Sequence, residues 1–343
     1  MGSSNAVQCL IFDRYGALLA EVEPEIEYAY WRLNNVGRAK FSLPYADPKC
    51  TQDNLRPGNR LLLRFGNGLP DWGGVIDLPR RRTSAGVTVQ AYTGEWLLGW
   101  RYTVKGRYFS SAAPGYIFDT LISEENVEYP TGIIPYSYYG AGTARTIEYH
   151  YHQLLKRCRD LARLTGNDFQ IAPHYEDGAL IFRSYWYERR GADLSGQVQL
   201  IEDVNADIVL DEQGPIVNRV LLAGSGSTWG SERIDAMAED AASRAEYGYR
   251  EWASVQGGVE QQATLDANAE ALLAEMAYPR DRFSIYALDK APATFAAYGV
   301  GDIVGAQAFF KSREFCYDGA VRVVAREWTS WNVCRLEVEV WRS

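Results

Sequence analysis

The stretch RLLLRFGNGLPDWGGVID, residues 60–77, reads as two strands joined by a turn. Arg60–Phe65 and Trp72–Asp77 are short apolar runs, and Gly66-Asn67-Gly68 lies between them. Runs of this length bounded by Gly and Asn favour β-strands connected by turns. Five further runs of the same kind surround this stretch, at 7–12, 17–20, 25–33, 39–43 and 86–92. Many short strands with Gly and Pro turns predict a small antiparallel barrel or sandwich.

The pattern of the sequence changes beyond about residue 110. Apolar residues recur at helical spacing from Leu154 to Leu164, Gly166 ends the run, and two strand-like runs follow at 168–172 and 179–187. The runs 208–210 and 217–223 flank an Asp211-Glu212-Gln213-Gly214 turn and predict a hairpin. Residues 265–276 predict a helix. Strand-like runs complete the chain at 283–288, 303–309, 321–328 and 333–341.

These patterns predict a mainly β protein, with two small antiparallel β-barrel domains, an inserted α+β domain and a linking helix. A chain of 343 residues is also longer than one hydrophobic core usually covers. The expected segments are a first barrel, the α+β insert, strands that return to the first barrel, a linker with its helix, and a second barrel. Their boundaries are 1–112, 113–205, 206–225, 226–282 and 283–343.

The charge balance is acidic. Lys and Arg number 35 and Asp and Glu number 44, which gives a formal net charge of -9 and a pI of about 5.1. Such a chain has no general electrostatic attraction to nucleic acid or to anionic lipid. Arg80-Arg81-Arg82 is the one basic run, and with Pro79 and Thr83 beside it we interpret it as a solvated turn.

No catalytic, metal or cofactor motif is found in the sequence. The five cysteines form no Cys-x-x-Cys pair, which indicates neither a disulfide framework nor a zinc site. Three histidines occur, and His150 and His152 fall where we expect a helix to begin, with Cys158 on the apolar face of that helix. A signal peptide and an apolar run of about 18 residues are also missing. We therefore expect a soluble protein that is not an enzyme and binds no membrane itself.

The aromatic content permits an alternative. Ten Trp, 23 Tyr and 12 Phe on a β scaffold are typical of proteins that bind or cleave carbohydrates. A glycosidase needs two carboxylates about 5–10 Å apart, and nothing in the sequence selects a pair among Glu124, Glu125, Glu128 and Asp71. The competing interpretation is that tryptophans fill barrel cores and subunit contacts. These tryptophans are Trp72, Trp96, Trp100, Trp328 and Trp341.

The order of these features resembles a known family. The first part of the chain has Asp13-Arg14-Tyr15-Gly16, then WRLNNVG at 31–37, FSLP at 41–44 and the two runs of residues 60–76. The later part has Leu154 to Phe169, Val217 to Val220, Asp240 to Ser243, Glu246 to Glu251 and Val300 to Val304. In this order they resemble the tail hub proteins of siphophage tails and of contractile baseplates.

This resemblance implies a structural protein of a bacteriophage or phage-like particle. Its three copies would form a ring at the tail tip, with six barrels in pseudo-sixfold order, that joins the sixfold tail tube to the threefold tip and lets DNA pass. The implied partners are two further copies of the chain, the tube or distal tail protein ring, the tape measure protein, and tip or spike proteins. The implied location is the virion, after assembly in the host cytoplasm. No lytic or receptor-binding module follows the last barrel, so we expect those activities on other chains.

Three physical expectations follow. Trp72 and Trp328 should be buried in a core or a subunit contact. The Gly224–Gly230 linker and the Ser231–Ala245 stretch should form a hinge, because they are polar and lack apolar periodicity. The lumen of a ring through which DNA slides should be acidic or neutral. The acidic loops Glu124-Glu125 and Asp211-Glu212 are candidates for its wall.

Overall fold

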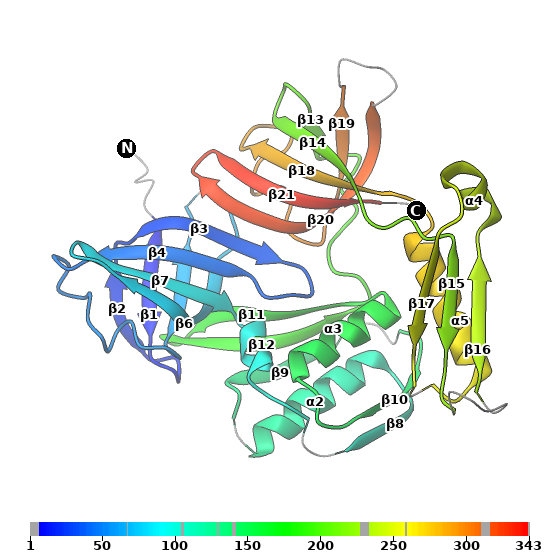
Figure 1. Ribbon diagram of the computed structural model, residues 1–343. Helices are drawn as coiled ribbons and strands as arrows, with labels where there is room; N and C mark the ends of the chain where they lie inside the picture. The colour runs from blue at the N-terminus through cyan, green and yellow to red at the C-terminus, as the bar shows by residue number, and fades with distance from the viewer. Residues whose placement is uncertain are drawn as a thin grey trace. The chain divides into compact units, whose positions relative to one another are not determined.

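The computed structural model describes residues 7–341, apart from 67, 104–105, 129, 139–141, 227–232, 258 and 310–315. The chain forms two compact units, and each is considered by itself. Unit 1 comprises Met1–Val209 with Ser284–Ser343, and unit 2 comprises Leu210–Phe283. About 48% of the protein is strand and 17% is helix, which confirms the mainly β class. Figure 1 shows the elements in chain order.

Seven strands near the N-terminus form one antiparallel region of the main sheet, in the order β3-β4-β7-β6-β5-β1-β2. The stretch of residues 60–77 lies in it as predicted, because Arg60↔Val75 and Leu63↔Trp72 are cross-strand pairs. Leu61, Leu62 and Leu63 are all buried. The strands are β1 (Gln8–Phe12), β2 (Leu18–Val22), β3 (Glu25–Arg32), β4 (Arg38–Pro44), β5 (Arg60–Arg64), β6 (Trp72–Arg82) and β7 (Gly86–Thr93).

The strands near the C-terminus extend the same sheet. β20 (Tyr317–Ser330) pairs with β19 (Ile303–Ala308) along its first half and with β3 near its end. On its other side it pairs with β21 (Val333–Val340), and β18 (Arg280–Leu288) and β14 (Ala206–Gln213) follow in order. β13 (Gln199–Ile201) is parallel to β19.

The sheet does not close into the two expected barrels. Eleven of its 13 strands form an open series from β14 to β2, with β13 and β19 off this series, and the pairings of the described residues close neither end. β20 has 14 residues, and it reaches past β19 to the edge of β3. The two β regions are therefore joined by hydrogen bonds.

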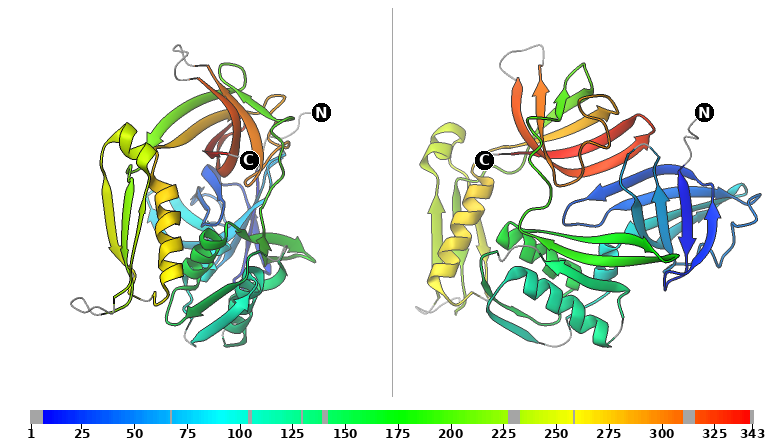
Figure 2. Two further views of the ribbon diagram at one scale, coloured as in Figure 1. Left: turned by 90° about the vertical axis from the view of Figure 1, so that its right-hand side faces the viewer. Right: turned by 180° about the vertical axis from the view of Figure 1, so that it is seen from behind.

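The predicted α+β insert is present between these regions. α2 (Pro114–Glu128) and α3 (Leu154–Thr165) lie along one face of a sheet of β11 (Asp168–Glu176), β12 (Ala179–Tyr187) and β9 (Ile133–Tyr138), as Figure 2 shows. β12 is antiparallel to β11 and parallel to β9. α1 (Glu95–Gly99) packs in the same core, and β8 (Arg107–Ala112) pairs with β10 (Arg145–Tyr149).

Helix α3 has the apolar face that its sequence predicts. Leu154, Leu155, Cys158 and Leu161 are buried. The helix ends at Gly166, whose φ of 69° lies in the left-handed region that glycine adopts readily. The insert lies very close to the N-terminal region of the main sheet, because a Cβ on Gly73 of β6 would lie 2.3 Å from the Cβ of Pro173 in β11.

Unit 2 is a three-stranded sheet with a helix along one face. β15 (Arg219–Ala223) lies between β16 (Asp235–Glu239), which is antiparallel to it, and β17 (Glu251–Val255), which is parallel. Val220, Leu222, Ala236 and Ala238 pack with Leu265 and Ala269 of α5 (Gln262–Met276), the predicted helix. The short helix α4 (Ala241–Tyr247) begins at Asp240, whose side chain accepts a hydrogen bond from the Ser243 backbone N–H.

Two local predictions in this part of the chain are wrong. Residues 208–223 do not form a hairpin, because β14 pairs with β18 while β15 pairs with β16 and β17. The expected Asp211–Gly214 turn instead contains the end of β14. The described parts of the expected hinge are residues 224–226 and 233–245; the second part contains β16 and the start of α4, and Ala236 and Ala238 anchor it to a core. Residues 227–230 of the expected linker lie outside the described residues.

Candidate functional site

The described residues bring no catalytic or metal-binding set together. None of their His, Cys, Asp and Glu side chains gather in groups of three or more that could hold a metal ion. Burial raises the pKa of Cys158, which confirms it as a small core residue rather than a reactive thiolate. His150 and His152 lie between β10 and α3, and His174 lies on β11. Among the helices that the structure describes, none is both long and apolar enough to span a membrane.

Three of the four carboxylates considered for glycoside cleavage form ion pairs with arginines. Glu124 and Glu125 lie in helix α2, not in a loop. Glu124 pairs with Arg107 at 2.6 Å, and Glu125 pairs with Arg101 at 3.6 Å. Asp71 pairs with Arg64 at 3.4 Å. The side chain of Glu128 lies outside the described residues. No described contact brings two of these carboxylates together in the way that a glycosidase requires.

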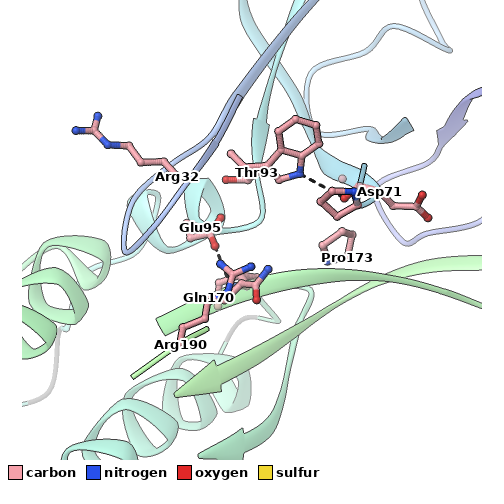
Figure 3. A pocket seen from close by; sticks show the side chains of 11 residues that line it. Arg32, Asp71, Thr93, Glu95, Gln170, Pro173 and Arg190 are labelled. Carbon is pink, nitrogen blue, oxygen red and sulfur yellow. Dashed lines mark hydrogen bonds between the residues drawn. The ribbon is translucent and has the colours of Figure 1, made fainter. Parts of the chain in front are cut away.

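A small polar pocket lies where β11 meets the first sheet (Figure 3). Glu95, at the start of α1, is 5% exposed, and it accepts a hydrogen bond from the Ile171 backbone N–H at 2.8 Å. Burial raises the pKa of Glu95, and that hydrogen bond and the Arg190 guanidinium oppose the shift. Figure 3 shows the Arg190 side chain directed toward Glu95, with Gln170 beside it. The cavity of about 70 Å³ is far smaller than a typical ligand site.

Next to this pocket a buried charge network connects three parts of unit 1. Asp168, the first residue of β11, is 1% exposed. It forms an ion pair with Arg322 of β20, and it accepts hydrogen bonds from the Asn34 side chain at 2.8 Å and the Arg190 backbone N–H at 2.7 Å. Asn34 in turn accepts from the Phe169 backbone N–H at 2.7 Å. The cluster fixes the insert against both β regions, so its role is positioning.

An aromatic surface covers the face of β11-β12-β9 that is turned away from α2 and α3. Tyr185 and Tyr187 are half-buried and stacked, with ring centroids 6.0 Å apart and planes at 12°. Tyr136 meets Tyr185 edge-on at 5.2 Å, and the Arg183 guanidinium lies 4.5 Å from the centre of the Tyr136 ring. The Tyr185 hydroxyl is 2.9 Å from His174 Nε2. Tyr and Arg are the residue types that protein interfaces favour.

A second surface, the apolar sheet face of unit 2, lies opposite α5. It consists of the outward side chains of β15, β16 and β17 and forms a shallow groove of about 490 Å³. Met237 is 59% exposed and Val255 is 68% exposed. Strand alternation explains the arrangement, because Ala236 and Ala238 face the core while Met237 faces outward. The apolar members of this face are Leu221, Ala223, Met237, Ala253 and Val255.

The tryptophans divide between core and surface. Trp72 is 0% exposed and Trp328 is 6% exposed, so the prediction that both are buried is confirmed. Trp328 contacts Phe65 and Trp331 in a series of rings that begins at Trp31. Trp96 and Trp341 are half-buried. Trp100 is 47% exposed, so it does not fill a core of the single chain, and its expected place in a subunit contact stays a prediction.

The basic run is not a turn. Arg80-Arg81-Arg82 forms the end of β6, paired with Val89, Thr88 and Val87 of β7. A register shift between Asp77 and Arg80 lets the strand continue past Pro79. Arg80 is half-buried, and Arg81 and Arg82 are exposed.

No protein-family model and no curated protein matches the sequence. Among solved structures, the chain is similar to the 43 kDa tail protein of prophage MuSo2 from Shewanella oneidensis, with a TM-score of 0.63 and 11% identity over 97% of this chain and 98% of that one. A tail protein from Neisseria meningitidis MC58 matches with a TM-score of 0.61 and 12% identity over 97% and 96% of the two chains. The chain has the fold of phage tail proteins.

A third structure extends this tail-protein fold to hub-like proteins. It is an E. coli component of the type VI secretion system that shows structural similarity to the T4 bacteriophage tail proteins gp27 and gp5. It matches with a TM-score of 0.50 and 9% identity, over 93% of this chain and 74% of that one. The resemblance inferred from residues 13–76 and from the later segments is thus confirmed at the level of the fold.

Proposed function

We propose that this protein is a structural hub protein in the tail or baseplate of a bacteriophage or phage-like particle, and that it is not an enzyme. The observation that carries the proposal is the likeness to the Shewanella prophage tail protein, which spans 97% of this chain and 98% of that one. A whole-chain match of this kind includes both β regions, the insert and unit 2. The surfaces described above support the same role, because a scaffold acts through subunit contacts.

The proposed assembly is a homotrimer at the tail tip of the virion, formed in the host cytoplasm. Its ring would join the sixfold tail tube to the threefold tip, with the distal tail protein ring, the tape measure protein and tip or spike proteins as neighbours. The apolar sheet face of unit 2 is a candidate contact for these neighbours, because exposed apolar groups gather there on both edge strands.

The proposed ring also lets DNA pass. Three copies with a formal charge of -9 each carry -27 in total, and a lumen wall that repels phosphate would not retain the strand. Glu124 and Glu125 are poor candidates for free lumen charges, because both are paired with arginine. The side chains of Asp211 and Glu212 lie outside the described residues.

The proposal is tested by the mass and symmetry of the purified protein. Mass photometry should show a species of about 116 kDa, three times the chain mass of 38.6 kDa. Negative-stain class averages should show a ring with threefold symmetry. A monomer at micromolar concentration, or a ring of another symmetry, would contradict the homotrimer.

A carbohydrate-binding role is the second candidate, and the aromatic surface is the observation that favours it. Sugars stack on flat, accessible rings, whereas here Arg183 lies over Tyr136 and the two neighbouring tyrosines stack on each other. We therefore expect no binding on an oligosaccharide array. Binding that Tyr185→Ala abolishes, with the fold intact by circular dichroism, would favour the sugar-binding role instead.

A further inference from the structure

The arginine strand, Arg80–Arg82, borders a pocket of about 140 Å³ beside the β6–β7 hairpin. Side chains alternate along a strand, so Arg80 and Arg82 share one face, and both line this pocket together with Tyr45 and Thr51. Arg80 Nη1 donates to the Leu55 carbonyl at 2.7 Å, which holds that guanidinium in place. The pocket therefore presents positive charge from side chains with defined positions.

The two outer arginines have no partner among the residues that the structure describes. Residues 43–58 and 72–93 are all described, and within the described structure Arg81 and Arg82 make no side-chain hydrogen bond or ion pair. Tyr45 is 49% exposed and Leu78 is 60% exposed, so apolar surface lies near the charges. Exposed aromatic and apolar groups combined with arginine are typical of protein contacts.

An acidic turn at another place in unit 1 has the complementary charge. Glu202 and Asp203 lie in the connection between β13 and β14, and Asp207 is the second residue of β14, with Asp203 and Asp207 exposed. Burial raises the pKa of Glu202, and the neighbouring Asp207 and Asp203 charges raise it further. The nearby Lys290 donates to the Val204 carbonyl at 3.1 Å rather than to a carboxylate. Val204 at the tip is 46% exposed.

The two surfaces do not neutralise each other within one chain. In the strand order of the main sheet, β18, β21, β20, β3 and β4 separate β14 from β7, and no described contact joins the arginine strand to the acidic turn. Two copies with a charge of -9 each repel one another unless opposite charges meet where they touch. A closed ring of identical chains also requires two different surfaces that fit each other.

We propose that the arginine strand of one copy docks on the acidic turn, Glu202–Asp207, of the next copy in the ring. This inference rests on the proposed trimeric hub and identifies one of its subunit contacts. Nucleic acid is the less favoured occupant, because the pocket is local and the chain as a whole repels phosphate.

The test compares two double charge reversals that change the net charge equally. Arg81→Glu with Arg82→Glu alters the arginine strand, and Arg159→Glu with Arg163→Glu alters two exposed arginines on α3 as the control. By mass photometry at 50 mM salt, the first variant should weaken the trimer about 100-fold while the control assembles normally. Asp203→Arg with Asp207→Arg should weaken it similarly, and all four changes in one chain should restore assembly. Circular dichroism melting shows that each variant folds.

The outcomes separate this contact from the wider proposal. A wild-type monomer would overturn both the trimer and the contact. A trimeric wild type with an equally trimeric Arg81→Glu, Arg82→Glu variant would overturn the contact alone, as would equal weakening by the α3 control. If the four-residue swap leaves the trimer as weak as either double reversal, the acidic turn is not the acceptor. Duplex DNA binding by the wild type that the arginine variant loses, with the trimer unchanged, would assign the arginines to nucleic acid.

Discussion

Replacing Trp72 with alanine should remove one of the largest contributions to the core of the first β region. The side chain is 0% exposed, and its indole N–H donates to the Tyr30 carbonyl at 3.1 Å. A buried tryptophan covers about 200 Å², which at ~25 cal/mol/Å² corresponds to about 5 kcal/mol. Alanine retains about 1 kcal/mol of that, and the lost hydrogen bond costs about 1 kcal/mol. We therefore expect a loss of about 4–5 kcal/mol, at the upper end of measured Trp→Ala changes.

The measurement is urea unfolding followed by far-UV circular dichroism at one fixed protein concentration, because assembly shifts apparent stability. Trp100→Ala is the matched control, since Trp100 is 47% exposed and its removal should change the free energy of unfolding by less than about 1 kcal/mol. Trp72→Phe, which keeps a ring but lacks the N–H, should fall between the two. A Trp72→Ala loss no larger than the Trp100→Ala loss would refute the reasoning.

Three further predictions concern the junctions of unit 1. Gly73→Ala should destabilise the protein by about 1–3 kcal/mol in urea unfolding, because the new Cβ would meet Pro173 at 2.3 Å. Gly196 has open space around it, so Gly196→Ala should leave the free energy of unfolding unchanged in the same measurement. Asp168→Asn should lower the free energy of unfolding by about 3 kcal/mol, because it leaves the Arg322 charge unpaired in a buried site. Lys40→Ala, which breaks the exposed pair with Glu27, is the control for chemical unfolding. An equally small loss in both variants would contradict this prediction. Glu95 should make stability fall as pH rises. Its folded pKa is raised by burial, so the native state holds a proton that the unfolded chain releases above about pH 4.3. The fall should occur between the pKa of Glu95 in the unfolded chain and its raised pKa in the folded protein, and Glu95→Gln should remove it. If the wild type and the Glu95→Gln variant give parallel profiles of urea midpoint against pH, the prediction is wrong.

Strong local patterns predicted most of the strands and two of the described helices, α3 and α5. Alternating residues such as Leu336 and Val338 are buried where the last strand was expected. The apolar spacing of α3 and its stop at Gly166 are likewise present. The hairpin expected over 208–223 was wrong because two apolar runs beside a turn can pair with each other or with more distant strands. Here β14 pairs with β18, and β15 pairs with β16 and β17. The expected hinge was wrong because β16 anchors itself with alanines, whose small side chains give a weak apolar signal.

The surfaces were harder to predict from the sequence. Asp168 lies 134 residues from Asn34 and 154 residues from Arg322, so no local spacing could reveal their contact. The arginine strand was interpreted as a turn because Pro79 usually ends a strand, whereas a register shift here accommodates it. For the apolar sheet face a signal did exist. In Asp235–Glu239, the alternation puts Met237 on the face opposite two alanines, a pattern that predicts an uncovered apolar strand face.

The pairing of β3 with β20 has a consequence for synthesis of the chain. Ala29 faces Trp328 across this ladder, so about 300 residues must be translated between the two partners. At ~5–20 residues per second, roughly 15–60 seconds pass before the ribosome has made the second strand. During that time the edge of β3 presents unpaired N–H and C=O groups to other nascent chains. Premature termination before residue 317 would leave this edge permanently open, and we expect such truncated chains to aggregate even though their first seven strands are complete.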